Sequence, residues 1–307
     1  MRRSSAVVAA LWAAAAAFVC AQAGVQPAPV FKAAADLVVL HVNVFDGRSD
    51  AVPDLPQGAF LVFEDDTAQK ITFFTGADVP VAVGLVVDNS SSMLTRRPMV
   101  LAGARAFVES SHEEDELFAI VFNEHVRFGL PDGVPFTRSR DQLSVALNWF
   151  PAGGKTALYD AVIAGLDHLQ QAPHQKRVLI VLSDGSDNAS RHSREEMIAR
   201  AIASDALIYT VTRRGGDTPQ RGDEGLMRRL ADVSGGVAYV ADGPEETVQQ
   251  FTEIAGNIRR GYSIGYVPPS AGDGRYHRVR VMVRVPGRTN LTARARDGYA
   301  SRPATAR

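Results

Sequence analysis

Residues 81–92 read VAVGLVVDNSSS, an apolar run that ends in a carboxylate, an amide and three serines. An uninterrupted apolar run of this length is typical of a strand that is buried on both faces of a parallel sheet. Open α/β sheets bind their ligands at the carboxyl ends of such strands. The side-chain oxygens of Asp88, Ser90 and Ser92 recur at every second residue of the loop that leaves this end, so they can converge on one hard cation.

Two later segments supply further oxygen ligands. Residues 153–160 read GGKTALYD and offer the hydroxyl of Thr156 after a glycine-rich turn. Residues 178–185 read VLIVLSDG, a second run typical of a buried strand, and it ends in the carboxylate of Asp184. The candidate metal ligands are therefore Asp88, Ser90, Ser92, Thr156 and Asp184.

Two carboxylates and three hydroxyls form an all-oxygen set, which suits Mg²⁺ and tolerates Mn²⁺ or Ca²⁺. Zinc is disfavoured, because the three segments contain no cysteine or histidine. Mg²⁺ takes about six ligands at ~2.1 Å, so these oxygens and bound waters would fill most of its shell and leave one position open. The alternative is a polar loop that caps a helix beginning near Pro98, with its oxygens accepting backbone N–H groups.

The three segments, in this order, resemble the metal-ion-dependent adhesion site (MIDAS) of a von Willebrand factor type A (VWA) domain. The family pattern is Asp-x-Ser-x-Ser, then a threonine, then an aspartate, and the five candidate ligands match it one for one. The resemblance implies that the open metal position takes an aspartate or glutamate from a partner protein. Ser91 stands where many members have glycine, and Lys155 places a positive charge beside the metal.

From residue 81 onward, apolar runs alternate with helical patterns, which indicates a doubly wound, Rossmann-like parallel sheet with helices on both faces. Strands are expected at 81–87, 117–122, 178–183, 207–211 and 237–240, with 126–128 as a hairpin partner of the second. Helices are expected at 157–170, 194–204, 225–233 and 245–260. Asp187 and Asn188, directly after the last candidate ligand, are expected either to orient metal-bound waters or to form a turn.

Both ends of the chain have the two-residue period of strands. The expected strands are 37–45, 59–66 and 69–74 before the VWA-like region, and 262–267, 278–285 and 291–296 after it. We expect the two ends to pair into one small β-rich domain, because so few strand residues cannot form a stable sandwich alone. This order also resembles that of bacterial secreted proteins with VWA-related domains.

The N-terminus is typical of a secretory signal peptide. Arg2 and Arg3 precede the apolar stretch 6–19, and residues 21–23, Ala-Gln-Ala, fit a cleavage site. Cleavage there also removes Cys20, the only cysteine. The prediction is an exported bacterial protein, periplasmic, secreted or on the cell surface; retention of the segment as a membrane anchor and lipidation of Cys20 are the alternatives.

The predicted organisation divides the chain into six parts. These are a signal peptide (1–23), a linker (24–35), an N-terminal β segment (36–77), a VWA domain (78–260), a C-terminal β segment (261–300) that pairs with the first, and a tail (301–307).

Several other functions find no support in the sequence. The formal net charge of -1 gives no support to nucleic-acid binding. Residues 153–156 lack the spacing of a phosphate-binding loop, which argues against nucleotides. The tripeptide at 221–223, Arg-Gly-Asp, is too short to indicate integrin binding. No histidine neighbours Ser90 or Ser92 in sequence as a base, so we predict a non-enzymatic module that binds a protein partner with an exposed acidic residue. A metal-dependent hydrolase and a structural envelope or assembly subunit are the alternatives.

Overall fold

The computed structural model describes residues 37–47, 51–76, 78–148, 151–212, 223–269 and 272–301, which all belong to one compact unit, residues 35–307. The predicted signal peptide and linker, the tail after Ser301, and residues 221–222 of the Arg-Gly-Asp tripeptide lie outside the described residues. Among the residues that are described, no helix is long and apolar enough to cross a membrane.

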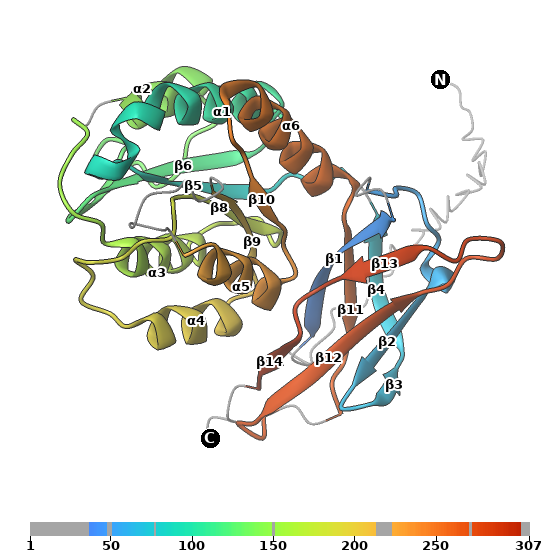
Figure 1. Cartoon of the computed structure of the whole chain (residues 1–307). Coiled ribbons are helices and arrows are strands. Elements are labelled where there is room, and N and C mark those ends of the chain that lie inside the picture. The colour runs from blue at the N-terminus through green and yellow to red at the C-terminus, as the bar shows by residue number, and fades with distance from the viewer. Residues whose placement is uncertain are drawn as a thin grey trace, which may run out of the picture. The chain divides into compact units, whose positions relative to one another are not determined.

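The largest sheet has six strands in the order β10-β9-β8-β5-β6-β7 (Figure 1). All neighbouring pairs are parallel except β6 and the edge strand β7, which form a hairpin. The bounds are β5 Ala82–Asp88, β6 Glu116–Phe122, β7 Val126–Phe128, β8 Arg177–Leu182, β9 Leu207–Thr212 and β10 Ala238–Val240. The predicted doubly wound sheet is confirmed.

Helices cover both faces of this sheet, with α1, α2 and α6 on one face and α3, α4 and α5 on the other (Figure 1). Their bounds are α1 Arg97–Glu109, α2 Arg140–Asn148, α3 Leu158–Leu169, α4 Arg194–Ala203, α5 Glu224–Ser234 and α6 Pro244–Arg260. Two short 3-10 helices, η1 (Gln57–Ala59) and η2 (Ser91–Arg96), complete the set in the described part of the chain. Helix α2 was not predicted; it buries only Leu143, Ala146 and Leu147.

The two ends of the chain form two four-stranded sheets, in the orders β13-β1-β11-β4 and β14-β12-β2-β3. Their strands are β1 Val38–Asp46, β2 Phe60–Glu64, β3 Thr67–Gln69, β4 Ile71–Gly76, β11 Tyr262–Tyr266, β12 Tyr276–Val283, β13 Leu291–Arg294 and β14 Gly298–Ala300. Strand β11, which follows α6, lies between β1 and β4. The six-stranded domain is thus inserted between two adjacent strands, β4 and β11.

One predicted strand was wrong. The segment 69–74 was expected to be continuous, but it divides at Lys70 into β3 and β4, which belong to different sheets. The tight hairpin between β2 and β3 follows from Asp65 and Asp66, whose φ angles of 46° and 64° suit a type I′ turn. Switching sheets at Lys70 lets one continuous segment contribute to both β layers.

Strand β5 is buried at every position and lies between β8 and β6. The loop that follows it, which carries Ser90 and Ser92, therefore leaves from the centre of the sheet. Gly84 of β5 is required by packing, because a Cβ at this position would lie 2.2 Å from the ring of Phe118 on β6. The carboxyl end of β5 is therefore held on a rigid, close-packed platform.

Candidate metal centre

The two candidate carboxylates lie at the ends of adjacent parallel strands. Strand β5 pairs with β8 in a register that sets Val87 opposite Leu182. Asp88 is the last residue of β5, and Asp184 follows the end of β8 by two residues. Both loops consequently leave the sheet side by side at its carboxyl edge.

Asp88 is a buried carboxylate, with 3 % of its surface exposed. Its Oδ2 accepts a hydrogen bond from Ser183 Oγ at 2.6 Å, and its Oδ1 accepts one from the Ser90 amide at 2.9 Å. Burial raises the pKa of Asp88 to about 6; the hydrogen bonds from Ser183 and Ser90 oppose this shift, and the charge of nearby Asp184 adds to it. An ionised Asp88 therefore lacks the compensation that a cation would provide.

The first loop directs its hydroxyls toward one another. Ser90 Oγ lies 3.2 Å from Ser92 Oγ, and the two residues are joined through the start of η2. The Ser90 side chain makes no capping hydrogen bond to η2, although its backbone has the extended conformation of a cap residue. The helix-capping alternative therefore does not account for the Ser90 hydroxyl.

Ser91 and a glycine-rich turn join the first loop to the second. The Ser91 amide donates to Gly154 O at 3.1 Å, and the Gly154 amide donates to Ser91 Oγ at 3.0 Å. Gly154 has a φ of +89°, and a Cβ at this position would lie 1.8 Å from Oε2 of Glu124. The serine that departs from the family pattern thus has a structural role, because its hydroxyl holds the turn that precedes Thr156.

Thr156 is buried and fixed by the third loop. Its amide donates to Asn188 Oδ1 at 2.8 Å, and its carbonyl accepts from the amides of Asn188 and Ala189 at 2.9 and 3.0 Å. Asp187 Oδ2 accepts the Tyr159 amide at 3.1 Å in the first turn of α3. In the described contacts Asp187 and Asn188 therefore fix backbone groups, as the turn interpretation predicted.

The structure brings all five predicted residues to one edge of the sheet, on three loops that are hydrogen-bonded to one another. Ser90, Asp88, Thr156 and Asp184 are buried, and Ser92 is exposed. Ser183, which bonds to Asp88, is not among the predicted site residues, and its only signal in the sequence is its position immediately before Asp184. Within the described residues no group of three or more His, Cys, Asp or Glu side chains could hold a metal, so a site here depends on the hydroxyls.

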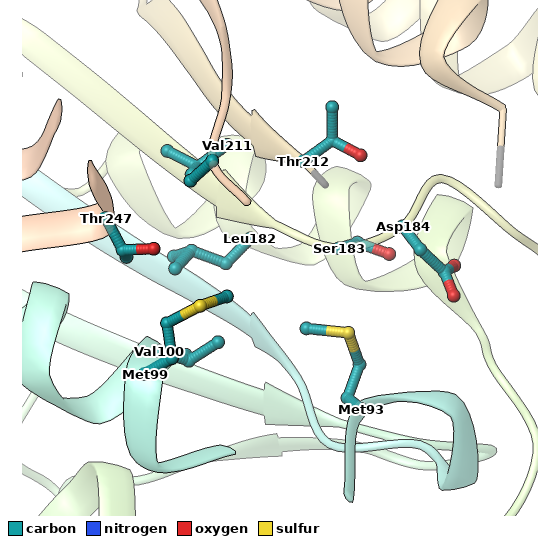
Figure 2. A pocket seen from close by; sticks show the side chains of 10 residues that line it. Met93, Met99, Val100, Leu182, Ser183, Asp184, Val211, Thr212 and Thr247 are labelled. Atoms are coloured by element: carbon teal, nitrogen blue, oxygen red, sulfur yellow. The ribbon is translucent and has the colours of Figure 1, made fainter. Parts of the chain in front are cut away.

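A small apolar hollow of about 20 Å³ lies beside Ser183 and Asp184 (Figure 2). Its apolar lining comes from α1, η2 and the ends of β8 and β9, and includes Met93, Met99, Val100, Leu182 and Val211. That volume accommodates about one water molecule. The hollow therefore places a mainly apolar wall beside Asp184, with the side chains of Thr212 and Thr247 also in its lining.

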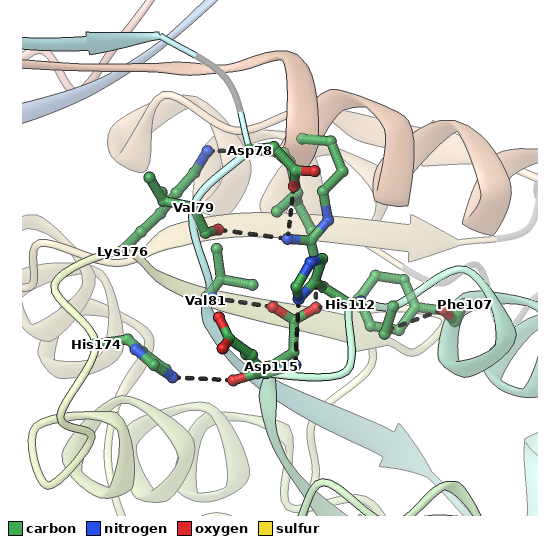
Figure 3. Close-up of polar contacts among 12 residues, drawn as sticks. Asp78, Val79, Val81, Phe107, His112, Asp115, His174 and Lys176 are labelled. Carbon is green, nitrogen blue, oxygen red and sulfur yellow. Dashed lines mark hydrogen bonds and ion pairs between the residues drawn. The ribbon is translucent and has the colours of Figure 1, made fainter.

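A second buried carboxylate, Asp115, provides an internal comparison at the amino edge of the same sheet (Figure 3). Its Oδ1 accepts the Val81 amide at 3.0 Å, and its Oδ2 accepts the His112 amide at 2.9 Å and pairs with the guanidinium of Arg259. Asp115 thus has its own cation. In the described part of the chain, the contacts of Asp88 come from Ser183 and Ser90, and none comes from an arginine or lysine.

Residues 83–186 match the family model of the von Willebrand factor type A domain. The six-stranded domain that contains this match has the fold of a von Willebrand factor type A domain. The matched range begins in β5 and ends just after Asp184, so it spans the three loops of the candidate centre.

The chain is also similar to solved structures at low sequence identity. The von Willebrand factor type A protein from Catenulispora acidiphila is 14 % identical, with a TM-score of 0.50, over 87 % of this chain and 74 % of its own. The vWF domain of the type V pili tip protein Mfa5 from Porphyromonas gingivalis is 14 % identical, with a TM-score of 0.47, over 60 % and 96 %. Proximal thread matrix protein 1 from the mussel byssus, with a zinc-occupied MIDAS motif, is 12 % identical, with a TM-score of 0.48, over 59 % and 48 %. None of the curated proteins compared with the chain matches it.

Proposed function

We propose that this protein is an exported, non-enzymatic binding module that captures an exposed aspartate or glutamate of a partner protein through Mg²⁺. The observation that carries the proposal is the buried carboxylate of Asp88, which is bonded to Ser183 and Ser90 at the carboxyl edge of the sheet, where three hydrogen-bonded loops leave it.

The residues present fit an oxygen-binding divalent cation. Asp88, Ser90 and Ser92 would hold it from the first loop, Thr156 from the second, directly or through water, and Asp184 from the third. A cation held by these residues would supply the positive charge that binds a carboxylate of the partner. Hard oxygen donors favour Mg²⁺, with Mn²⁺ or Ca²⁺ as substitutes.

The charges of the centre suit an acidic partner. Two carboxylates balance the charge of a divalent ion, so an incoming carboxylate meets no net negative charge at the metal. Lys155 lies next to Thr156, and its side chain is exposed. Its positive charge adds to the attraction of an acidic group, because an exposed lysine can remain solvated until the partner arrives.

The same contacts support a binding role over hydrolysis. A metal-dependent hydrolase needs a base that is positioned beside the metal. The histidine of the neighbouring 186–193 loop, His192, has its Nδ1 bonded to Asp160 Oδ1 at 2.7 Å, so this ring is already engaged by a carboxylate outside the five candidate ligands. A structural envelope subunit would share the metal site and differ only in the partner that it binds.

Partner capture tests this proposal. The mature protein is immobilised and exposed to the envelope fraction of the source organism, once in Mg²⁺ and once in EDTA. Two variants are treated in the same way: Asp88→Ala, and the matched control Asp132→Ala, which changes an exposed carboxylate in the loop after β7. We expect one or more proteins to be retained by the parent and Asp132→Ala only in Mg²⁺, and by Asp88→Ala in neither condition. Equal capture with and without the metal would contradict the proposal.

A further inference from the structure

The β-rich part of the protein contains a buried histidine between two carboxylates. His277, in β12, has only 4 % of its surface exposed. Its Nδ1 lies 2.8 Å from Oδ2 of Asp65, in the β2–β3 turn, and its Nε2 lies 3.0 Å from Oδ1 of Asp273, in the segment between β11 and β12. One side chain thus joins two loops that are about two hundred residues apart in sequence.

These two contacts define the protonation state of the ring. A neutral imidazole donates from one nitrogen and presents a lone pair at the other. Facing a carboxylate with that lone pair would be repulsive, because an ionised carboxylate only accepts hydrogen bonds. Both short contacts are satisfied at once only when both ring nitrogens carry a proton, which is the imidazolium form.

A third carboxyl group, Glu64, adds to this requirement. Its Oε2 accepts hydrogen bonds from Tyr266 Oη at 2.6 Å and Tyr299 Oη at 2.9 Å. Its Oε1 is buried and has no hydrogen-bond partner within the described chain, and it lies 3.9 Å from His277 Nδ1. A positive ring is the ionic partner that this buried oxygen otherwise lacks.

The remaining neighbours do not reverse the balance of charge. The centres of the Tyr299 and His277 rings are 5.5 Å apart. The guanidinium of Arg296 lies over the Tyr299 ring, 5.6 Å from its centre. Arg275 and Arg278 contribute backbone amides, which donate to Asp273 and Asp65 at 2.9 Å. The hydrogen bond from His277 to Asp273, followed by the one to Asp65, raises the pKa of His277 above its ordinary value, against the smaller effect of burial.

We propose that His277 is a proton-dependent latch, which as an imidazolium ties the β2–β3 turn to the loop before β12 and on losing its proton loses this link between them. The loop keeps two other ties, since the Gly272 amide donates to Ser301 Oγ and the Ser301 amide donates to Arg275 O. Deprotonation therefore loosens residues 65–67 and 272–277 locally and leaves the sheets paired. The latch is independent of the proposed metal site.

The direction of the pH effect follows from linkage. The pKa of His277 is raised in the folded protein relative to the unfolded chain, so the latch contributes its full stability below about pH 6.5. That contribution is lost as the pH rises through the folded-state pKa. Alkaline pH, and not acid, is therefore the signal that opens the latch.

Two measurements on the full chain test the latch. The ring ¹⁵N shifts of His277, assigned by their absence in His277→Gln, should show two protonated nitrogens at pH 6 and a titration midpoint above 6.5. Hydrogen exchange, corrected for its intrinsic pH dependence, should show at least a threefold loss of protection in residues 65–67 and 272–277 as the pH passes that midpoint. A neutral tautomer at pH 6, or unchanged protection across the midpoint, would overturn the proposal.

Variants separate the latch from a purely structural histidine. Asp273→Asn removes one of the two charges that hold the proton and should lower the midpoint of His277; because Asp273 is exposed, this variant should fold. His125→Gln, in the exposed β6–β7 turn, is the control and should leave the transition in residues 272–277 unchanged. If Asp273→Asn leaves the His277 midpoint where it was, the latch is refuted, whatever the behaviour of His277→Gln.

Discussion

Acidification should destabilise the protein through one buried histidine, His41 in β1. Its side chain is buried, and its Nδ1 lies 3.0 Å from Ser263 Oγ on the adjacent strand β11. The pKa of His41 is lowered to about 4, mainly by burial and also by the positive charges of Lys176 and Arg296, while the charge of Asp205 opposes the shift. The folded protein therefore keeps this ring neutral at a pH where the unfolded chain protonates it.

The magnitude follows from the two pKa values. With a pKa of about 6.5 in the unfolded chain and about 4 in the fold, the unfolded state binds almost one proton more than the native state at pH 5. Linkage converts this difference into a loss of about 2 kcal/mol of unfolding free energy between pH 7 and pH 5. His277 acts in the opposite direction, so the loss must be isolated by comparison with a variant.

The assay is urea unfolding of the parent and of His41→Gln at pH 7 and pH 5. The substitution itself can change stability at both pH values, so the quantity to compare is the change between them. We expect the parent to lose about 2 kcal/mol more than the variant, with similar m-values for both. Equal losses in the two proteins would refute the interpretation of His41 as a buried neutral group.

Three further predictions concern the interior and the three loops. Arg259→Ala leaves the buried carboxylate of Asp115 without its cation and should lower the unfolding free energy by about 3 kcal/mol. The control Arg280→Ala removes an exposed pair with Asp66 and should lower it by less than about 1 kcal/mol. Similar urea midpoints for the two variants would contradict this prediction. Gly103→Ala places a Cβ 2.6 Å from Phe251 and forces α1 away from α6, so it should lower the unfolding free energy by about 1–3 kcal/mol and lower the thermal midpoint. The control Gly58→Ala has no atom within 4 Å of the added Cβ and should leave the thermal midpoint nearly unchanged. Asn188→Ala frees the amide of Thr156 and should weaken Mg²⁺ binding roughly 10-fold in calorimetry; parental affinity would show that Asn188 has no positioning role.

Much of the fold was predictable because its main elements have strong patterns. The apolar runs of β5 and β8 identify central parallel strands, and the helix α3 shows a regular buried face at Leu158, Val162, Leu166 and Leu169. Helix α2 was not predicted, because it has few apolar positions and polar residues surround them in the sequence. The break between β3 and β4 at Lys70 was not predicted either, since a strand that changes sheets keeps its two-residue period.

The candidate site was predictable only in its residue types. Spacing identified Asp88, Thr156 and Asp184 as possible ligands, but no local pattern shows that Ser183 bonds to Asp88 or that Asn188 fixes Thr156. These contacts join loops that are 32 to 95 residues apart, and they depend on the pairing of β5 with β8. The contact of His277 with Asp65 is equally long-range, because it depends on the β12–β2 pairing, whereas Asp273 is only four residues from His277 in the sequence.

Calorimetric titration of Asp88→Asn with Mg²⁺ tests the central claim most directly. The amide can keep both hydrogen-bond contacts, accepting from the Ser90 amide and donating to Ser183 Oγ, so circular dichroism should show an intact fold. Removing one of two carboxylates should abolish measurable Mg²⁺ binding, whereas Thr156→Ala should weaken it only mildly because water can replace a neutral hydroxyl. The account predicts one bound Mg²⁺ per parent chain and none in Asp88→Asn; a folded Asp88→Asn protein that binds Mg²⁺ as tightly as the parent would contradict it.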